Sequence, residues 1–158
     1  MTRNILITSC LSIILLTSCK KDNITLSKSD YMIFGHFYGR CKGEQCIEIF
    51  KLQQDKLSED TTDQYPNREI FYEGAYVQLS KEKYNETKDL PNYFPTDLLY
   101  EKENVIGQPD AGDWGGLYIE YNFKGMRKYW LLDKMKSNVP VKYHNFIDKL
   151  NEKITLLQ

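Results

Sequence analysis

The stretch LYIEYNF at residues 117–123 decides which fold this chain can adopt. Apolar or aromatic residues at positions 117, 119, 121 and 123 alternate with other residues at 118, 120 and 122, which is the period of a strand with one buried face. A turn around Gly125 leads into residues 127–133, which are rich in aromatic and leucine side chains. The two runs predict a β-hairpin in the second half of the chain.

The first half of the chain contains three shorter runs that also predict strands, at residues 31–38, 47–52 and 57–60. Short turns separate the runs, so together they predict an antiparallel meander. Gly35 stands inside the first run, where a glycine indicates a bulge or a close approach of another backbone. Residues 69–79 fit either a strand or the approach to a helix.

Two helices are expected to cover this sheet. After Pro140, which suits a first helical turn, six apolar or aromatic residues recur on one helical face. They are Tyr143, Phe146, Ile147, Leu150, Ile154 and Leu157. A shorter middle helix is predicted after Ser80, which serves as its N-cap. The predicted fold class is α+β: an antiparallel sheet, made of the N-terminal meander and the C-terminal hairpin, packed by these two helices.

The amino terminus predicts export. Residues 5–16 form an apolar run of about a dozen residues, whereas a membrane-spanning helix needs about 20. Arg3 precedes the run and small residues follow it, as in a signal peptide. The sequence Leu16-Thr17-Ser18-Cys19 resembles the bacterial lipobox. An ordinary secretory peptide with a chance cysteine is the alternative.

The resemblance to a lipobox implies a domain organisation and a location. Residues 1–18 would be a cleaved signal peptide, Cys19 would carry the lipid within a flexible tether at residues 19–29, and residues 30–158 would form a single globular domain. Two or three acyl chains on Cys19 are enough for stable anchoring. The predicted partner is therefore a membrane, held through the N-terminal lipid, and the predicted location is the cell envelope, at the outer membrane, with its face undecided.

Composition excludes one class of partner and leaves another open. The chain has 158 residues with 21 Lys and Arg against 22 Asp and Glu, a formal charge of -1. Such a balance, with no block of like charge, excludes a nucleic-acid partner, which would require a basic face. Twelve Tyr, seven Phe and two Trp make the chain rich in aromatic residues. These residues can fill a core or line a surface that binds sugar or peptide.

The four cysteines reduce to one pair under the lipoprotein interpretation. Cys10 is cleaved away and Cys19 is acylated, which leaves Cys41 and Cys46. In an exported protein this pair predicts a local disulfide. Chain entropy gives so small a ring about 2 kcal/mol of stabilisation.

The chain offers few residues for metal or acid–base chemistry. A zinc site at the two cysteines would need both histidines, His36 and His144, as its further ligands. A hydrolase would need one histidine near a serine and a carboxylate, and no Gly-X-Ser-X-Gly motif occurs. No catalytic residue, metal site or cofactor is therefore predicted, and a hydrolase with a histidine-based site is kept as an alternative.

The most unusual loop spans residues 108–116, and it contains the candidate ligand-binding residues Asp110, Asp113 and Trp114. Trp114, which is followed by glycines, could stack on a sugar. The two aspartates could bind calcium, but calcium requires six to eight oxygen ligands. Local hydrogen bonds that the aspartates accept from backbone amides of a glycine-rich loop are the favoured interpretation.

The order of these elements resembles that of a group of small lipoproteins of Gram-negative bacteria. The resemblance rests on the Cys-X-Gly-X-X-Cys turn at residues 41–46, on residues 106–120 and on the helix after Pro140. Members of that group often carry cysteines where this chain has Gln108 and Ala111, so a second disulfide is not expected. The resemblance implies no activity.

The sequence thus predicts a lipid-anchored envelope lipoprotein that is a non-enzymatic binding or structural module. One alternative is a glycan- or peptide-binding surface protein that uses Trp114 and neighbouring tyrosines. An envelope protein or a glycan is its possible partner.

Overall fold

The computed structural model describes residues 25–158. The predicted signal peptide, the lipobox and residues 19–24 of the tether, with Cys19, lie outside the described residues. Within the part described, no helix combines the length and the apolar character needed to cross a membrane.

The described chain folds around a seven-stranded sheet with the strand order β4-β3-β2-β1-β6-β7-β5. The strands are β1 (Tyr31–Phe37), β2 (Ile47–Gln53), β3 (Leu57–Asp60), β4 (Tyr76–Gln78), β5 (Val105–Ile106), β6 (Gly116–Phe123) and β7 (Met126–Asp133). Neighbouring strands are antiparallel except β5 and β7. The predicted α+β class, the meander and the hairpin are confirmed.

Strand β1 joins the two predicted pieces of the sheet. It pairs over its whole length with β2 on one side and β6 on the other, so that Phe34 lies opposite both Phe50 and Ile119. The register runs through Gly35 without a bulge. A Cβ atom at Gly35 would lie 2.0 Å from the carbonyl oxygen of Glu48, so this glycine marks a close backbone approach.

The two edge strands are short. Of residues 69–79, which were ambiguous in the sequence, Tyr76–Gln78 form β4 at one edge. At the other edge β5 pairs in parallel with Leu131 and Leu132 only. A strand of two residues has no period to detect, and the sequence did not predict β5.

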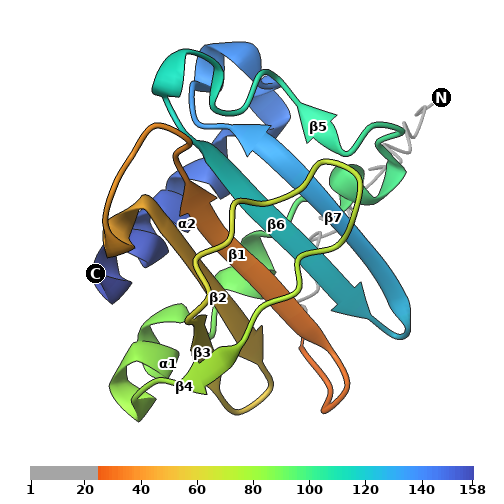
Figure 1. Ribbon diagram of the computed structural model, residues 1–158. Helices are drawn as coiled ribbons and strands as arrows, with labels where there is room; N and C mark the ends of the chain where they lie inside the picture. The colour runs from red at the N-terminus through yellow and green to blue at the C-terminus, as the bar shows by residue number, and fades with distance from the viewer. Residues whose placement is uncertain (1–24) are drawn as a thin grey trace, which may run out of the picture.

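Two helices lie on one face of the sheet, which we call the helix face (Figure 1). Helix α1 comprises Lys81–Thr87, and the hydroxyl oxygen of Ser80 accepts a hydrogen bond from the Lys83 amide at 3.4 Å, as expected of its N-cap. Helix α2 comprises His144–Leu157. Short 3-10 turns occur at Glu44–Cys46, Leu90–Tyr93, Thr96–Tyr100, Ala111–Asp113, Lys136–Asn138 and Val141–Tyr143.

The main core lies between the helix face and α2. All six residues predicted to form the apolar face of this helix are buried. They pack with residues of the sheet and of the turns, among them Met32, Phe34, Phe50, Leu52, Phe94, Leu117, Ile119, Tyr121, Trp130 and Leu132.

The opposite face of the sheet is covered by the segment of residues 61–75, which we call the strap, and this face is the loop face. The strap crosses in front of β1, β6 and β7 (Figure 1). Tyr72 from the strap packs in a second core with Ile33, Phe37 and Tyr118. The expectation that residues 117–123 bury one face only is therefore wrong. Tyr118 and Glu120 are fully buried because the strap excludes water from their side of β6.

Candidate functional site

Three loops meet at the end of the sheet where β1 ends and β6 begins. We call this region the loop end, and it consists of residues 38–46, 63–67 and 107–115. One oxygen of Asp110 accepts hydrogen bonds from the Gly39 amide at 2.8 Å and from the Tyr65 hydroxyl at 2.9 Å. Its other oxygen accepts one from the Gly115 amide at 3.1 Å. Only the bond from the Gly115 amide is the local backbone hydrogen bond that the sequence favoured over calcium binding, because Gly39 and Tyr65 lie 71 and 45 residues away in the chain.

Trp114 lies on the surface of the loop end, and 62% of the residue is exposed. The residue that follows Trp114 packs closely against a neighbouring ring. Gly115 has φ +77°, and a Cβ atom there would lie 2.3 Å from the ring of Tyr38, so only glycine fits between Trp114 and this ring. The indole is therefore displayed on an ordered loop.

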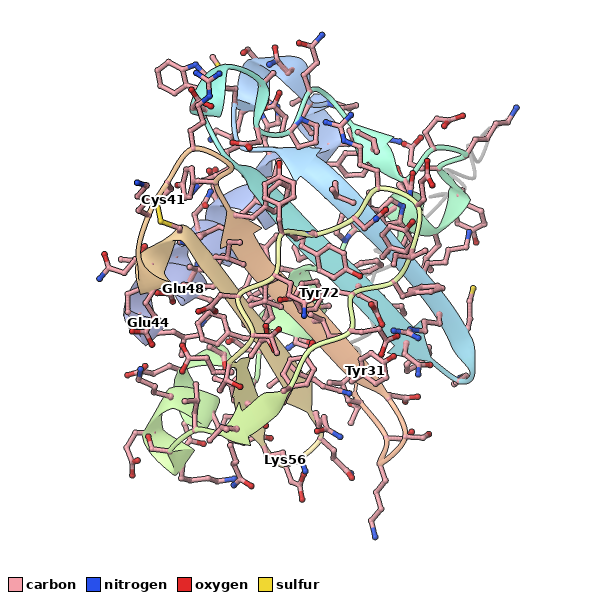
Figure 2. The ribbon with its side chains drawn as sticks, in the orientation of Figure 1. Tyr31, Cys41, Glu44, Glu48, Lys56 and Tyr72 are labelled. Carbon is pink, nitrogen blue, oxygen red and sulfur yellow. A yellow bond between two sulfur atoms is a disulfide. The ribbon has the colours of Figure 1, made fainter. Side chains whose placement is uncertain are left out.

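The predicted disulfide closes the first of these loops. Cys41 and Cys46 are bonded, with their Cα atoms 5.5 Å apart (Figure 2). The carbonyl oxygen of Cys46 accepts a hydrogen bond from the Tyr38 amide at 2.9 Å, next to the last pair of β1 and β2. The disulfide therefore fixes the loop beside which Asp113 forms an exposed ion pair with Arg40 at 3.7 Å.

Two tyrosines of the loop end, Tyr38 and Tyr65, have charged hydrogen-bond partners. The Lys134 ammonium donates a hydrogen bond to the Tyr38 hydroxyl and lies over its ring, 4.6 Å from the centroid. Partial burial and the hydrogen bond to Asp110 raise the pKa of Tyr65 to about 12, so its hydroxyl stays neutral at physiological pH. An exposed indole with fixed polar groups nearby is a surface suited to a sugar, which offers an apolar ring face and hydroxyl groups.

Both candidate aspartates of the loop end, Asp110 and Asp113, have partners within the chain. Among residues 25–158 no group of three or more His, Cys, Asp and Glu side chains is placed to hold a metal ion. Asp110 is engaged within the chain, and Asp113 faces Arg40.

The histidines lie apart from the chemistry that a hydrolase would need. The ring Nε2 of His36 lies 3.0 Å from the carbonyl oxygen of Gln45, and burial lowers the pKa of this histidine. The Nε2 of His144 lies 2.9 Å from the carbonyl oxygen of Val139. In the described part of the chain, neither imidazole has a hydrogen bond to a serine or a carboxylate.

A buried polar network that the sequence did not predict lies on the loop face. One oxygen of Glu120 accepts hydrogen bonds from the Tyr31 hydroxyl at 2.9 Å and from Nε of Arg127 at 2.6 Å. The other accepts one from the Tyr118 hydroxyl at 2.7 Å. The same Tyr118 hydroxyl accepts a hydrogen bond from the Tyr72 amide at 3.0 Å, which ties the strap to β6.

Asp60 holds the strap in the same manner where β3 ends. The carboxylate accepts hydrogen bonds from the Tyr72 hydroxyl at 2.6 Å and from the Thr62 hydroxyl at 2.7 Å. The amides of Asp63 and Ala75 donate to it as well. Burial, followed by the bond to Asp60, raises the pKa of Tyr72 (Figure 2), which therefore stays a neutral donor. This network fixes the strap, and we assign it no ligand.

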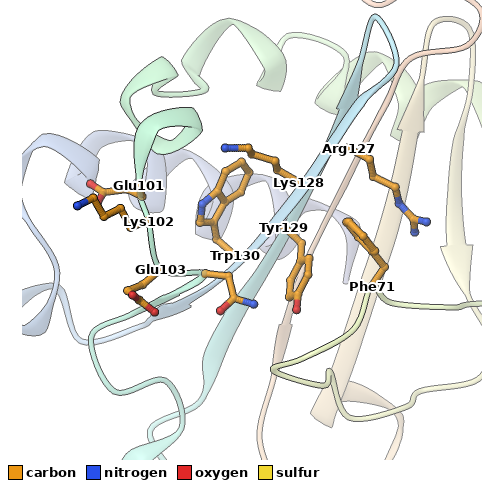
Figure 3. A pocket seen from close by; sticks show the side chains of 9 residues that line it. Phe71, Glu101, Lys102, Glu103, Arg127, Lys128, Tyr129 and Trp130 are labelled. Atoms are coloured by element: carbon orange, nitrogen blue, oxygen red, sulfur yellow. The ribbon is translucent and has the colours of Figure 1, made fainter.

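A hollow of about 210 Å³ lies beside β7 (Figure 3). Figure 3 shows Lys128 and Trp130 on one side of the strand and Arg127 on the other. The remaining wall is made by Phe71 from the strap and by residues 101–104. We call this hollow the edge groove.

A smaller hollow of about 120 Å³ is acidic. It lies where β2 and β3 meet, and Glu44, Glu48, Glu59 and Asp63 line it. Burial raises the pKa of Glu48, Glu59 and Asp63, and neighbouring carboxylates add to the rise.

The structure thus brings Asp110, Asp113, Trp114 and the disulfide together at the loop end, and within residues 25–158 each histidine ring has a backbone carbonyl as its hydrogen-bond partner. Sequence reasoning missed Glu120, Tyr118 and the edge groove. The alternation placed Glu120 on a solvent face, and the one signal against this was the aromatic content of the strap, which includes Phe71 and Tyr72.

Comparison with known proteins adds no relative. No protein-family model, no curated protein and no solved structure matches the chain. The resemblance to small Gram-negative lipoproteins stays a prediction, and function has to be argued from the site alone.

Proposed function

We propose that this protein is a non-enzymatic binding module, anchored in the cell envelope by lipid on Cys19, that binds carbohydrate at its loop end. The observation that carries the binding proposal is the 62% exposure of Trp114 on an ordered loop. An exposed indole offers a flat apolar face and one N–H donor to a partner, and tryptophan is enriched among the residues that dominate binding energy. Tyr38, Tyr65 and Arg40 supply aromatic surface and hydrogen-bond donors around it.

Carbohydrate is favoured over peptide at this end because the surface lacks what an extended peptide needs. No strand edge of the described sheet runs through the loop end, so a peptide backbone would find no row of amide and carbonyl partners there. A sugar needs only a flat aromatic surface and a few fixed polar groups.

The binding experiment uses the full chain in detergent micelles and intrinsic fluorescence. The chain has two tryptophans, and Trp130 is only 2% exposed in the core, so a sugar that stacks at the loop end changes the emission of Trp114 alone. Cell-wall and capsular oligosaccharides are the probes. Because Trp114→Ala removes this reporter, the affinities of the parent and of the variants are compared by isothermal titration calorimetry. Trp114→Ala is expected to weaken binding by at least about tenfold, as for a central aromatic contact.

Tyr100→Ala is the matched control, because Tyr100 is 84% exposed outside the loop end. Its affinity should equal that of the parent. Unchanged affinity in Trp114→Ala, or binding of unstructured peptides with no response to any oligosaccharide, would overturn the carbohydrate proposal.

The anchor has its own test. Mass spectrometry of the mature amino terminus should find Cys19 as the first residue, carrying acyl chains, and Cys19→Ala should release the protein from membranes. An unmodified Cys19 in membrane-bound protein would refute the proposed anchoring.

A further inference from the structure

The edge groove follows from an incomplete pairing of β7. Strand β5 pairs only with Leu131 and Leu132, and the Leu131 amide donates to the carbonyl oxygen of Asn104 at 2.7 Å. Backbone groups of alternate residues in a strand point to the same side. The amide and carbonyl groups of Arg127 and Tyr129 therefore also point outward, toward the edge groove, beyond the reach of β5.

The walls of the edge groove are tied to one another, so the groove is formed in advance. The carbonyl oxygen of Arg68 in the strap accepts hydrogen bonds from the Asn104 side chain at 2.8 Å and from the Tyr129 hydroxyl at 3.0 Å. Lys128 donates to the carbonyl oxygen of Leu99 at 2.6 Å. A ligand would meet an open strand edge between two fixed walls and would not have to order them, which favours affinity.

The side chains around the edge supply apolar contact. The rings of Phe71 and Tyr129 meet edge to face, with centroids 5.0 Å apart, and the Arg127 guanidinium lies 4.1 Å from the centroid of Phe71. Trp130 contributes to the lining from the other side of β7 (Figure 3). Alternate side chains of an added strand would thus have aromatic surface on both faces of the sheet.

The charged side chains that line the edge groove determine which peptide composition it favours. Arg127 is paired with Glu120 at 2.6 Å and with Glu73 at 3.8 Å, and Glu101 is paired with Lys142 at 3.0 Å. Within residues 25–158 no ion pair involves the other charged groups of the lining, which are Lys102, Glu103 and Lys128. The lining as a whole holds three cations, Lys102, Arg127 and Lys128, against two carboxylates, Glu101 and Glu103, so it carries an excess of one positive charge.

A second copy of this chain fits the same edge poorly. Because β5 occupies Leu131 and Leu132, two β7 strands could pair only when centred near Lys128. That register sets Lys128 directly opposite its own copy, and like charges in such a cross-strand pair are destabilising.

We propose that the edge groove binds a short, extended, acidic peptide segment of another protein, which adds a strand to β7 and pairs with the backbone of Arg127 and Tyr129. The mode is strand addition, in which backbone hydrogen bonds give affinity and alternate side chains give specificity. The site is independent of the loop end and of the proposed carbohydrate.

The test titrates the full chain, in detergent micelles, with a labelled acetylated peptide of sequence Glu-Val-Glu-Val-Glu and follows its anisotropy. Two matched probes replace glutamate by lysine, or methylate the backbone nitrogens that would donate to β7. The acidic peptide should bind, and each matched probe should bind at least about tenfold more weakly, since a lost pairing leaves strand groups unsatisfied. Hydrogen exchange at the Arg127 and Tyr129 amides should slow when the acidic peptide is added.

Lys102→Glu should remove the preference for the acidic peptide over the basic one. Lys88→Glu is the control, because it makes the same change of charge on an exposed residue directly after α1. Trp114→Ala should leave peptide binding unchanged, which separates this proposal from the proposed function.

Three results would overturn the proposal: no binding of the acidic peptide at millimolar concentration, equal binding of the methylated peptide, or no slowing of exchange in β7. Concentration-dependent dimerisation in sedimentation, with the same β7 amides protected and no peptide present, would assign the edge to a second copy.

Discussion

Glu120 is the residue whose replacement tests the buried polar network beneath the strap most directly. Its side chain is fully buried, and its two oxygens accept hydrogen bonds from Tyr31, Tyr118 and Arg127. The replacement Glu120→Gln keeps the volume of the side chain but removes its charge and one of its two acceptor oxygens. It therefore probes the network without opening a cavity.

The expected loss of stability in Glu120→Gln follows from the three hydrogen bonds that Glu120 accepts. The amide nitrogen of glutamine, which replaces one carboxylate oxygen, cannot accept from the Tyr118 hydroxyl, and one lost bond to a charged group costs about 1.5–3 kcal/mol. The bonds from Tyr31 and Arg127 survive at roughly half strength, because charge assistance about doubles a hydrogen bond. The loss of the ion pair is discounted, because the Arg127 side chain is 34% exposed and can be hydrated. The expected cost is about 3 kcal/mol.

The assay is urea unfolding of the full chain in detergent micelles, with the slope m compared between variants. The midpoint should fall while m stays constant. Glu69→Gln is the matched control, since Glu69 lies in the same strap with its side chain exposed, and it should shift the stability by less than about 0.5 kcal/mol.

A cycle with Tyr118→Phe isolates the hydrogen bond between the Tyr118 hydroxyl and the Glu120 carboxylate. The double variant should be more stable than the sum of the two single losses predicts, by about 1 kcal/mol or more, because both changes remove the same bond. A cost below about 1 kcal/mol for Glu120→Gln, together with additive losses in the cycle, would refute a buried carboxylate that holds these three partners.

Two further perturbations act elsewhere in the fold. Replacing Cys41 and Cys46 together by alanine should cost about 2 kcal/mol in urea unfolding, and reduction of the parent should cost the same amount; a much larger loss would mean that the disulfide holds more than its own loop. Glu48→Gln should stabilise the protein at pH 7 by less than about 1 kcal/mol. Burial and the neighbouring Glu59 raise the folded pKa of Glu48 above its usual value of 4.5, so the parent loses stability as pH rises from about 4.5 through the raised pKa, and the advantage of the variant should vanish near pH 4. An equal stability difference at both pH values would contradict this assignment.

Several elements were predictable because their signal is local. The alternation in β6 and the recurrence of apolar residues in α2 repeat with the period of the element itself, and each pattern needs only a few consecutive residues. Ser80 acts on an amide three residues away. The edge strand β5 has two residues and owes its pairing to β7, so no window of the sequence contained it.

In the candidate sites, too, the sequence indicated the local features, and contacts between distant segments decided the rest. Trp114 was a candidate because of its glycine-rich surroundings, but its exposure depends on how three loops pack. Asp110 was assigned to local hydrogen bonding, and its main partners proved to be 45 and 71 residues away in the chain. The edge groove joins the strap, residues 101–104 and β7, and no sequence pattern connects them.

The sequence by itself determined the fold class, the hairpin, the two helices and the pairing of Cys41 with Cys46, because periodicity, capping and short spacing act between near neighbours. Only the tertiary structure decided that β1 joins the two halves of the sheet and that the strap buries Glu120. It also decided that β7 keeps half of its edge unpaired. These features arise from contacts between segments that are distant in the sequence. The free energy of such contacts depends on which surfaces are removed from water, and that is decided only when the whole chain has folded.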